Sequence, residues 1–264
     1  MGIKFCSLSS GSSGNCQYIE TDRMKVLIDG GLSGKKIEGL LSSIDVCPTT
    51  IDSILVTHEH IDHVRGVGVL SRRYDIPIYA NENTWISMEK TIGEIKGHNI
   101  KVIESNKDFE LGDLDIHSFE IFHDAAEPIG FCVYHNNTKI SIITDTGWVN
   151  DSIKRKIKGS SLYLMESNHD VKMLKEGKYP WYLKKRISST NGHLSNLEAG
   201  QTLSEVLSGN GEIVLLAHLS KENNRPAIAY DTVRKYMEYY GMNVHRDIAL
   251  DLTYRDKATK VYTL

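Results

Sequence analysis

A dense cluster of metal-ligand side chains guides the interpretation of this sequence: Thr57-His58-Glu59-His60-Ile61-Asp62-His63. It directly follows Asp52–Val56, an apolar run of the kind that forms a buried strand. Imidazole and carboxylate groups together suit zinc, manganese or iron. Four such side chains within six residues cannot all reach one tetrahedral ion through so tight a turn. We therefore predict two divalent metal ions, with His58 and His60 on one and Asp62 and His63 on the other.

Three further ligand candidates each stand at the end of an apolar, strand-like run: His123, Asp145 and His218. Taken singly, each of them would more often be a structural residue than a ligand. Each ion nevertheless needs ligands beyond those that residues 58–63 supply. With that cluster present, we interpret all three as residues of the metal site.

The composition is that of an ordinary globular protein, with 264 residues, 40% hydrophobic, 25% charged and a formal net charge of −3. This balance excludes a uniformly basic nucleic-acid coat protein and a disordered chain. The four cysteines lie far apart without a C-x-x-C pair, so we expect reduced thiols. The chain shows no signal-peptide pattern and no apolar run near the ~20 residues of a membrane span. We therefore expect a cytoplasmic protein without a membrane partner.

Strand-like and helical patterns alternate along the chain without a long linker, repeat or low-complexity block. This interleaving favours two sheets packed face to face with helices outside, a four-layer αββα sandwich of the α/β (α+β) class, in a single domain over residues 1–264. The Gly-rich segment 9–14 precedes a strand pattern, which argues against a Rossmann or P-loop phosphate site. Helices are predicted at Ile37–Ile44, Val64–Tyr74, Ala227–Tyr240 and after a capping box at Ser195. The predicted strands are Lys4–Leu8, Cys16–Glu20, Lys25–Ile28, Asp52–Val56, Ile76–Ala80, Asp113–Phe122, Gly130–His135, Lys139–Thr144, Ser161–Met165 and Glu212–Ala217.

The order of the acidic and histidine motifs resembles the metallo-β-lactamase-fold hydrolase superfamily over almost the whole chain, with Asp29 preceding the cluster at 58–63. The resemblance implies that His58, His60 and His123 hold one ion. It implies that Asp62, His63 and His218 hold the second and that Asp145 bridges the two. Asp62 is also assigned a catalytic role, and Asp29 is expected to support the ligand loop from behind. Flavo-diiron members of this fold carry Glu where this chain has His60, which favours hydrolysis over redox chemistry.

Four longer segments narrow the resemblance to the YycJ/WalJ branch of that superfamily: residues 7–16, 123–131, 166–170 and 218–226. The branch is described as bacterial, cytoplasmic nucleases that degrade DNA as 5′→3′ exonucleases. It is also associated with mismatch repair and with a two-component regulatory system. The resemblance therefore implies a DNA substrate and a functional link to one of these systems.

Glu166 and His193 resemble an acid and histidine pair that tRNA-processing nucleases of the same fold carry before the last ligand. By that resemblance, a metal-bridging hydroxide attacks the scissile phosphate, and His193, oriented by Glu166, protonates the leaving oxygen. The alternative for His193 is an exposed residue before a helix cap. His169 either lines the site and supports it, or closes the turn at residues 166–170.

Residues 151–192 contain ten Lys and Arg but only four Asp and Glu. The densest run, Lys184-Lys185-Arg186, lies beside Trp181, so we predict that it contacts backbone phosphates. The alternative for this run is a solvated helical face. Further candidate substrate contacts are Ser10, Ser12, Asn15 and Lys221.

These patterns favour a dinuclear-metal phosphodiesterase or nuclease that acts on DNA, with RNA as an open alternative. A small-molecule hydrolase of the same fold, such as a thioesterase, lactonase or cyclic phosphodiesterase, would use the same ligand cluster. The Glu166 and His193 pair and the basic stretch favour the nuclease. A non-catalytic regulatory partner is the third alternative, and the intact ligand set argues against it.

Overall fold

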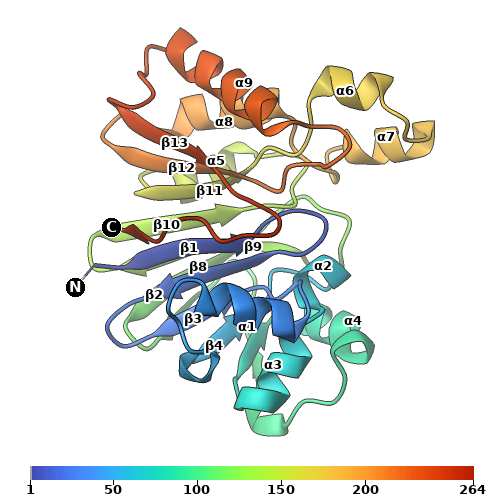
Figure 1. Ribbon diagram of the computed structural model, residues 1–264, viewed down its shortest axis with the longest axis vertical. Coiled ribbons are helices and arrows are strands. Elements are labelled where there is room, and N and C mark those ends of the chain that lie inside the picture. Colours follow the sequence, from blue (N-terminus) through green and yellow to red (C-terminus); the bar gives the residue numbers. More distant parts are fainter. Residues whose placement is uncertain (1) are drawn as a thin grey trace.

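Two β-sheets packed face to face form the centre of the computed structural model, which describes residues 2–264 (Figure 1). Within those residues the first sheet has the strand order β14-β1-β2-β3-β4-β5-β6, and the second has the order β13-β12-β11-β10-β9-β8-β7. The strands of the first sheet are β1 (Lys4–Ser9), β2 (Cys16–Glu20), β3 (Lys25–Ile28), β4 (Ser53–Leu55), β5 (Ile78–Ala80), β6 (Ile100–Val102) and β14 (Tyr262–Thr263). Those of the second are β7 (Asp108–Leu111), β8 (Leu114–Glu120), β9 (Ile129–His135), β10 (Thr138–Ile143), β11 (Leu162–Glu166), β12 (Glu212–Ala217) and β13 (Ile248–Leu252).

Helices cover the outer faces of both sheets (Figure 1). The first sheet carries α1 (Gly34–Ser42), α3 (Val67–Tyr74) and α4 (Glu82–Ile92), whose buried residues pack against its outer face. The second carries α5 (Asp151–Ile157), α8 (Asn196–Val206) and α9 (Pro226–Tyr239). The short α2 (Ile61–Val64) lies at one end of the sandwich, and α6 (Val171–Glu176) and α7 (Trp181–Ile187) project on the same side. Three-residue 3-10 turns occur at Pro48–Thr50 and Gly97–Asn99.

The alternation of side chains along the strands divides the apolar core into three layers. In β3, Val26 and Ile28 point into the core between the sheets, while Leu27 points toward the helices. In β12, Leu215 lies between the sheets, and Leu216 packs in the layer under α5, α8 and α9. This is the two-residue period of a strand that is buried on both faces. The four-layer αββα sandwich predicted from the sequence is therefore confirmed.

The predicted elements differ from the observed ones mainly where segments cross closely. The expected helix Val64–Tyr74 is wrong as a single element, because α2 ends at Val64 and α3 begins only at Val67. At the break, the Gly66 N–H donates to Gly30 O at 2.7 Å, and a side chain on Gly66 would lie 2.3 Å from Leu32 O. The capping box at Ser195 is confirmed at the start of α8.

Several elements lacked a clear pattern in the sequence. The helices α4 to α7 and the strands β6 and β7 were not predicted, because they are short or carry few buried residues.

Among residues 2–264, no helix combines the length and apolar character that crossing a bilayer requires.

Parallel strands bring the candidate ligands to one edge. β3 pairs in parallel with β4, and β10, β11 and β12 are parallel to one another. Residues that follow the carboxyl ends of parallel strands gather at the same edge of a sheet. Asp29, the loop at 57–63, Asp145 and His218 all follow such ends, and Glu166 closes β11.

Gly31 lies where three segments of this edge meet. Its N–H donates to Asn15 O at 2.8 Å, and the Asn15 N–H donates to Asp62 O at the same distance. A side chain at this position would have its first carbon 1.6 Å from Asp62 O. Only glycine therefore lets the Asp62 backbone approach this closely.

Replacement of Gly31 by alanine should push the ligand loop outward and lower the free energy of unfolding by about 1–3 kcal/mol or more, as overpacking does. Urea denaturation of metal-free protein would measure it. Gly39→Ala is the matched control, because Gly39 lies in α1 with open space around it. That variant should be neutral or more stable by roughly 0.5–1 kcal/mol. Equal stability of the Gly31→Ala variant and the wild type would contradict the close approach.

Candidate metal centre

Three acidic and imidazole side chains leave their strands through a left-handed backbone turn. Asp29 has a φ of 62°, Asp145 of 58° and His218 of 53°. This conformation is uncommon for residues other than glycine, although Asp, Asn and His adopt it more often than most. Each turn comes directly after, or two residues after, a parallel strand. Such strained conformations concentrate at functional sites.

One group of ring nitrogens is formed by histidines alone. His58 Nε2 lies 3.1 Å from His60 Nδ1, which in turn lies 3.3 Å from His123 Nε2. The nitrogens of the three residues all lie within 4.8 Å of one another. Burial, together with the neighbouring His63, holds the pKa of His58 well below its usual range, and burial lowers the pKa of His123. Two of the three rings therefore favour the neutral form that binds metals.

The second group contains Asp62, His63 and His218, whose ligand-type atoms also lie within 4.8 Å of one another. His63 Nε2 is 3.9 Å from Asp62 Oδ2, and His218 Nε2 is 3.8 Å from the same oxygen. Burial would lower the pKa of His218. The charge of Asp145 and the contacts with Asp62 and Glu166 instead raise it to about 10.

Asp145 lies between the two groups. Its Oδ2 is 3.2 Å from His63 Nε2, and its Oδ1 is 3.4 Å from His218 Nδ1 and 3.9 Å from His123 Nε2. Burial would raise the pKa of this carboxyl, but His218 and His63 hold it well below its usual range. The carboxylate is therefore ionised and faces both sets of rings.

Two buried atoms of this site lack a hydrogen-bond partner among residues 2–264. They are Asp145 Oδ2 and His218 Nε2. A buried polar atom without a partner is costly, and each such case calls for an explanation. A cation supplies one, because imidazole nitrogens and carboxylate oxygens are the ligands of zinc and related ions. The residues present therefore fit divalent metal ions.

Asp29 connects the ligand loop to the end of β3. Its Oδ2 lies 2.7 Å from His63 Nδ1, and its Oδ1 accepts the Thr57 N–H at 2.9 Å. The Thr57 hydroxyl donates to the same carboxylate at 2.9 Å. These contacts fix the orientation of the His63 ring and leave its Nε2 toward Asp145. They are the contacts that a supporting role of Asp29 requires.

Glu166 joins His193 to His218. Its Oε1 lies 2.8 Å from His193 Nδ1 and 2.9 Å from His218 Nδ1, while Oε2 accepts the Thr146 N–H at 2.8 Å. Burial would raise the pKa of Glu166, but His193 and the hydrogen bonds from both rings lower it. The side chain of His193 is one-fifth exposed and lines a cavity of about 260 Å³.

The remaining predicted residues lie in different places. Ser12 and Arg186 line the cavity beside His193, and Arg186 forms an ion pair with Asp124. Ser10 and Asn15 are buried: the Ser10 hydroxyl accepts the His218 N–H at 2.9 Å, and Asn15 Nδ2 lies 3.0 Å from His63 Nε2. Both therefore contact the histidines directly, and a contact with substrate stays a prediction.

Helix α7 divides the predicted basic run. Lys184 and Lys185 line a separate cavity of about 700 Å³ behind the helix, together with Trp181 and His169. Arg186 instead lines the cavity beside His193, because each further helical residue is rotated by about 100° around the axis, so the three basic residues do not share one face. His169 Nδ1 has no hydrogen-bond partner within the described residues, and the residue lines this second cavity, so a supporting role in the metal site stays a prediction. The neighbouring Asn168 lines the smaller cavity beside His193 instead.

The sequence analysis missed Thr57 and Asn168. Asn168 Nδ2 donates to His218 O at 2.9 Å and so holds the last ligand candidate. Its position two residues after Glu166, at the end of a strand, was the available signal.

Comparison with known proteins identifies the family. Residues 25–219 match the model of the beta-lactamase superfamily domain. The chain is 42% identical over 261 residues to the exodeoxyribonuclease YycJ of Bacillus anthracis, covering 99% of both chains. It is 41% identical to the exodeoxyribonuclease WalJ of Streptococcus pneumoniae D39, covering 98% of this chain and 97% of that one.

The chain belongs to the YycJ/WalJ family of the beta-lactamase superfamily. Among solved structures, the metallo-beta-lactamase fold protein YhfI of Bacillus subtilis superposes with a TM-score of 0.73, covering 98% of this chain and all of that one at 16% identity. That likeness shows the fold alone. Both the superfamily and the branch expected from the sequence are therefore confirmed.

Glu166 offers a direct test of how this YycJ/WalJ-family site is held together. In Glu166→Gln, an NH₂ group takes the place of one carboxylate oxygen. If it replaces Oε2, it faces the Thr146 N–H, and if it replaces Oε1, the two histidine Nδ1 atoms lose their acceptor. We expect the free energy of unfolding to fall by about 1–3 kcal/mol, as for a buried hydrogen-bonding group left unpaired. Denaturation in EDTA separates this effect from metal binding. An unchanged midpoint would contradict the role of Glu166 as a buried acceptor.

Proposed function

We propose that this protein is a metal-dependent exodeoxyribonuclease that degrades DNA in the 5′→3′ direction. The observation that carries the proposal is the convergence of two sets of ligand-type atoms on the Asp145 carboxylate. The near full-length similarity to proteins named exodeoxyribonuclease supports the substrate class. The functional link to mismatch repair or a two-component system belongs to the same proposal, on resemblance alone.

The proposed ligands follow the two groups described above. His58, His60 and His123 would hold one divalent ion, and Asp62, His63 and His218 the other, with Asp145 shared. Ions bound there would supply a water of lowered pKa as nucleophile and neutralise charge on the scissile phosphate. Asp62 has the more exposed carboxylate, 19% against 3% for Asp145, so it faces incoming water and is assigned a catalytic role.

His193 is the proposed general acid. Its Nδ1 faces Glu166, so the ring is held with Nε2 free to act elsewhere. Protonated His193 would donate the Nε2 proton to the leaving 3′ oxygen, and the buried Glu166 carboxylate would stabilise the charged ring. Arg186 lines the same cavity, where a guanidinium suits a phosphate.

Digestion of end-labelled nucleic acids tests the proposed activity. Metal-free protein reloaded with zinc, manganese or iron should release nucleotides progressively from the 5′ end of DNA. Single- and double-stranded DNA and RNA, with 5′-phosphate or 5′-hydroxyl ends, would define the preferred substrate. Thioester, lactone and cyclic nucleotide substrates provide the comparison. Turnover of one of these without any cleavage of nucleic acid would contradict the proposal.

Asp145→Asn should abolish cleavage and reduce the bound metal, because the shared carboxylate loses its charge. Asn adopts the left-handed backbone about as readily as Asp, so this variant avoids the strain that alanine would add. Elemental analysis and DNA digestion of the purified variant are the measurements. Asp75→Asn is the control, since Asp75 is exposed, also has a left-handed φ of 57° and lies outside the site. Wild-type metal content and turnover in Asp145→Asn would remove Asp145 from the site.

His193→Ala should keep its metal ions yet cleave DNA roughly 10²–10⁴-fold more slowly, the usual contribution of a general acid. A nitrophenyl phosphodiester, whose leaving group needs no proton, should be affected much less. Steady-state rates on both substrates, together with metal content, provide the test. His98→Ala is the control, because His98 is exposed and pairs only with Asp75. Equal losses on the two substrates would contradict the assignment.

A further inference from the structure

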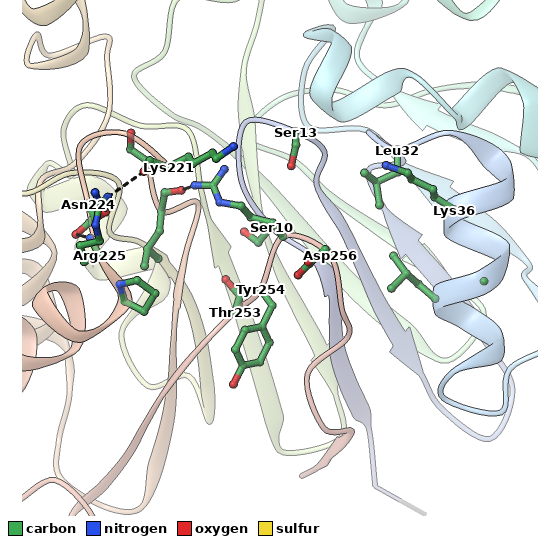
Figure 2. A pocket seen from close by; sticks show the side chains of 16 residues that line it. Ser10, Ser13, Leu32, Lys36, Lys221, Asn224, Arg225, Thr253, Tyr254 and Asp256 are labelled. Atoms are coloured by element: carbon green, nitrogen blue, oxygen red, sulfur yellow. Dashed lines mark hydrogen bonds between the residues drawn. The ribbon is translucent and has the colours of Figure 1, made fainter. Parts of the chain in front are cut away.

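A cavity of about 770 Å³ lies between the two halves of the sandwich (Figure 2). One wall comes from α1 with Lys36 and from the loop after β1 with Ser10 and Ser13. The other wall comes from the loops that follow β12 and β13. In Figure 2, the Lys221 side chain extends from the loop after β12 toward Ser13. Residues that are distant in sequence therefore enclose one space.

The cavity is lined by cations that form no salt bridge, although the charges of Asp256 and Glu222 act on Arg255 from a greater distance. Lys36, Lys221, Arg225 and Arg255 form no salt bridge with any residue in the described chain, and Asp256 is the one acidic residue among those that line the cavity. The two arginines donate only to backbone carbonyls: Arg225 to Asn224 O at 2.7 Å and Lys221 O at 3.1 Å, and Arg255 to Leu219 O. Unpaired positive charges that converge on a concave surface attract an anion.

Two further features of the cavity suit a nucleotide chain. The long helix α9 begins here with Pro226 at its first turn, without a capping side chain or an acidic residue in that turn, so its positive end adds to the charge. Tyr254 is about one-third exposed and has the Lys257 ammonium 4.1 Å from its ring centroid. An exposed aromatic ring beside cations is a surface on which bases stack.

The cavity continues the opening of the candidate metal centre. Ser220 lines both this cavity and the smaller one that contains His193. Ser12 lines the cavity beside His193, and its neighbour Ser13 lines the larger one. The Ser10 hydroxyl, at the cavity wall, accepts the backbone N–H of His218. A strand whose phosphate lies beside His193 would thus reach Lys221 and Arg255 along one continuous surface.

We propose that this cavity binds the backbone phosphates of a single-stranded segment that flanks the scissile phosphodiester. Lys36, Lys221, Arg225 and Arg255 are the phosphate contacts, and Tyr254 is a stacking surface. An aromatic ring can stack only on bases that are not already stacked in a duplex, so these groups favour a single strand. The inference rests on the proposed nuclease function and adds where the substrate strand lies. It places that path between the two halves rather than over Lys184 and Lys185 on α7.

A salt series with a fluorescent oligothymidylate and metal-free protein in EDTA tests the proposal without cleavage. The Lys36→Ala/Lys221→Ala variant should bind more weakly, and its slope of log affinity against log salt should be flatter by about 1.4, at about 0.7 for each lost contact. Lys90→Ala/Lys235→Ala is the matched control, with two exposed lysines removed outside the cavity, and should match the wild type. Lys184→Ala/Lys185→Ala tests the other path and should also match it.

The outcomes separate the two levels of the proposal. An unchanged slope in Lys36→Ala/Lys221→Ala, with wild-type protein that binds and cleaves DNA, would overturn the cavity assignment alone. A loss confined to Lys184→Ala/Lys185→Ala would overturn it as well and place the strand on α7. Wild-type protein that neither binds the oligonucleotide nor cleaves nucleic acid when loaded with metal would overturn the nuclease function, and the cavity assignment with it.

Discussion

The buried carboxylate of Asp145 is the interaction on which the site depends. It lies within 4 Å of imidazole nitrogens from four different segments of the chain, those of His63, His123, His193 and His218. A buried charge is tolerated only where partners compensate it. The surrounding rings must therefore stay in place for the carboxylate to stay ionised. This mutual requirement ties the ligand loop of the first sheet to the strand ends of the second.

The fold makes this convergence possible because both sheets contain runs of parallel strands. The carboxyl ends of parallel strands gather at one edge, and the left-handed turns at Asp29, Asp145 and His218 carry the side chains across it. Asp29 then holds the His63 ring through its Nδ1, and Glu166 holds the rings of His193 and His218 in the same way. Supporting carboxylates of this kind orient metal ligands and set which ring nitrogen is free. The proposed general acid and the proposed ligand His218 thus share one support, Glu166.

Substrate recognition, as proposed, belongs to the loops and to the outer helices. Around the metal centre, α7 separates a small cavity beside His193 from a larger one behind it. On another side, the loops after β1, β12 and β13 enclose unpaired cations. A protein of net charge −3 can hold a polyanion only through such local excess of positive charge. The YycJ/WalJ family membership and this charge distribution support the same class of substrate.

Local sequence determined much of this protein. The alternation of apolar residues predicted most of the strands that flank the site, and the spacing of His58, His60, Asp62 and His63 predicted a site for more than one ion. The identity of each candidate ligand is a property of the side chain itself, so it can be recognised without a structure. The Ser195 capping box is equally local and formed as expected.

Tertiary structure alone decided the environment of these residues. The helix Val64–Tyr74 breaks because the backbone at Gly30 and Leu32 approaches Gly66. Ser10 and Asn15 are buried against histidines that lie far along the chain. Lys36 and Arg255 meet in one cavity although they stand near opposite ends of the sequence. Burial and long-range proximity depend on how the two sheets pack, and a pattern that repeats every two or four residues carries no information about which distant segment lies opposite.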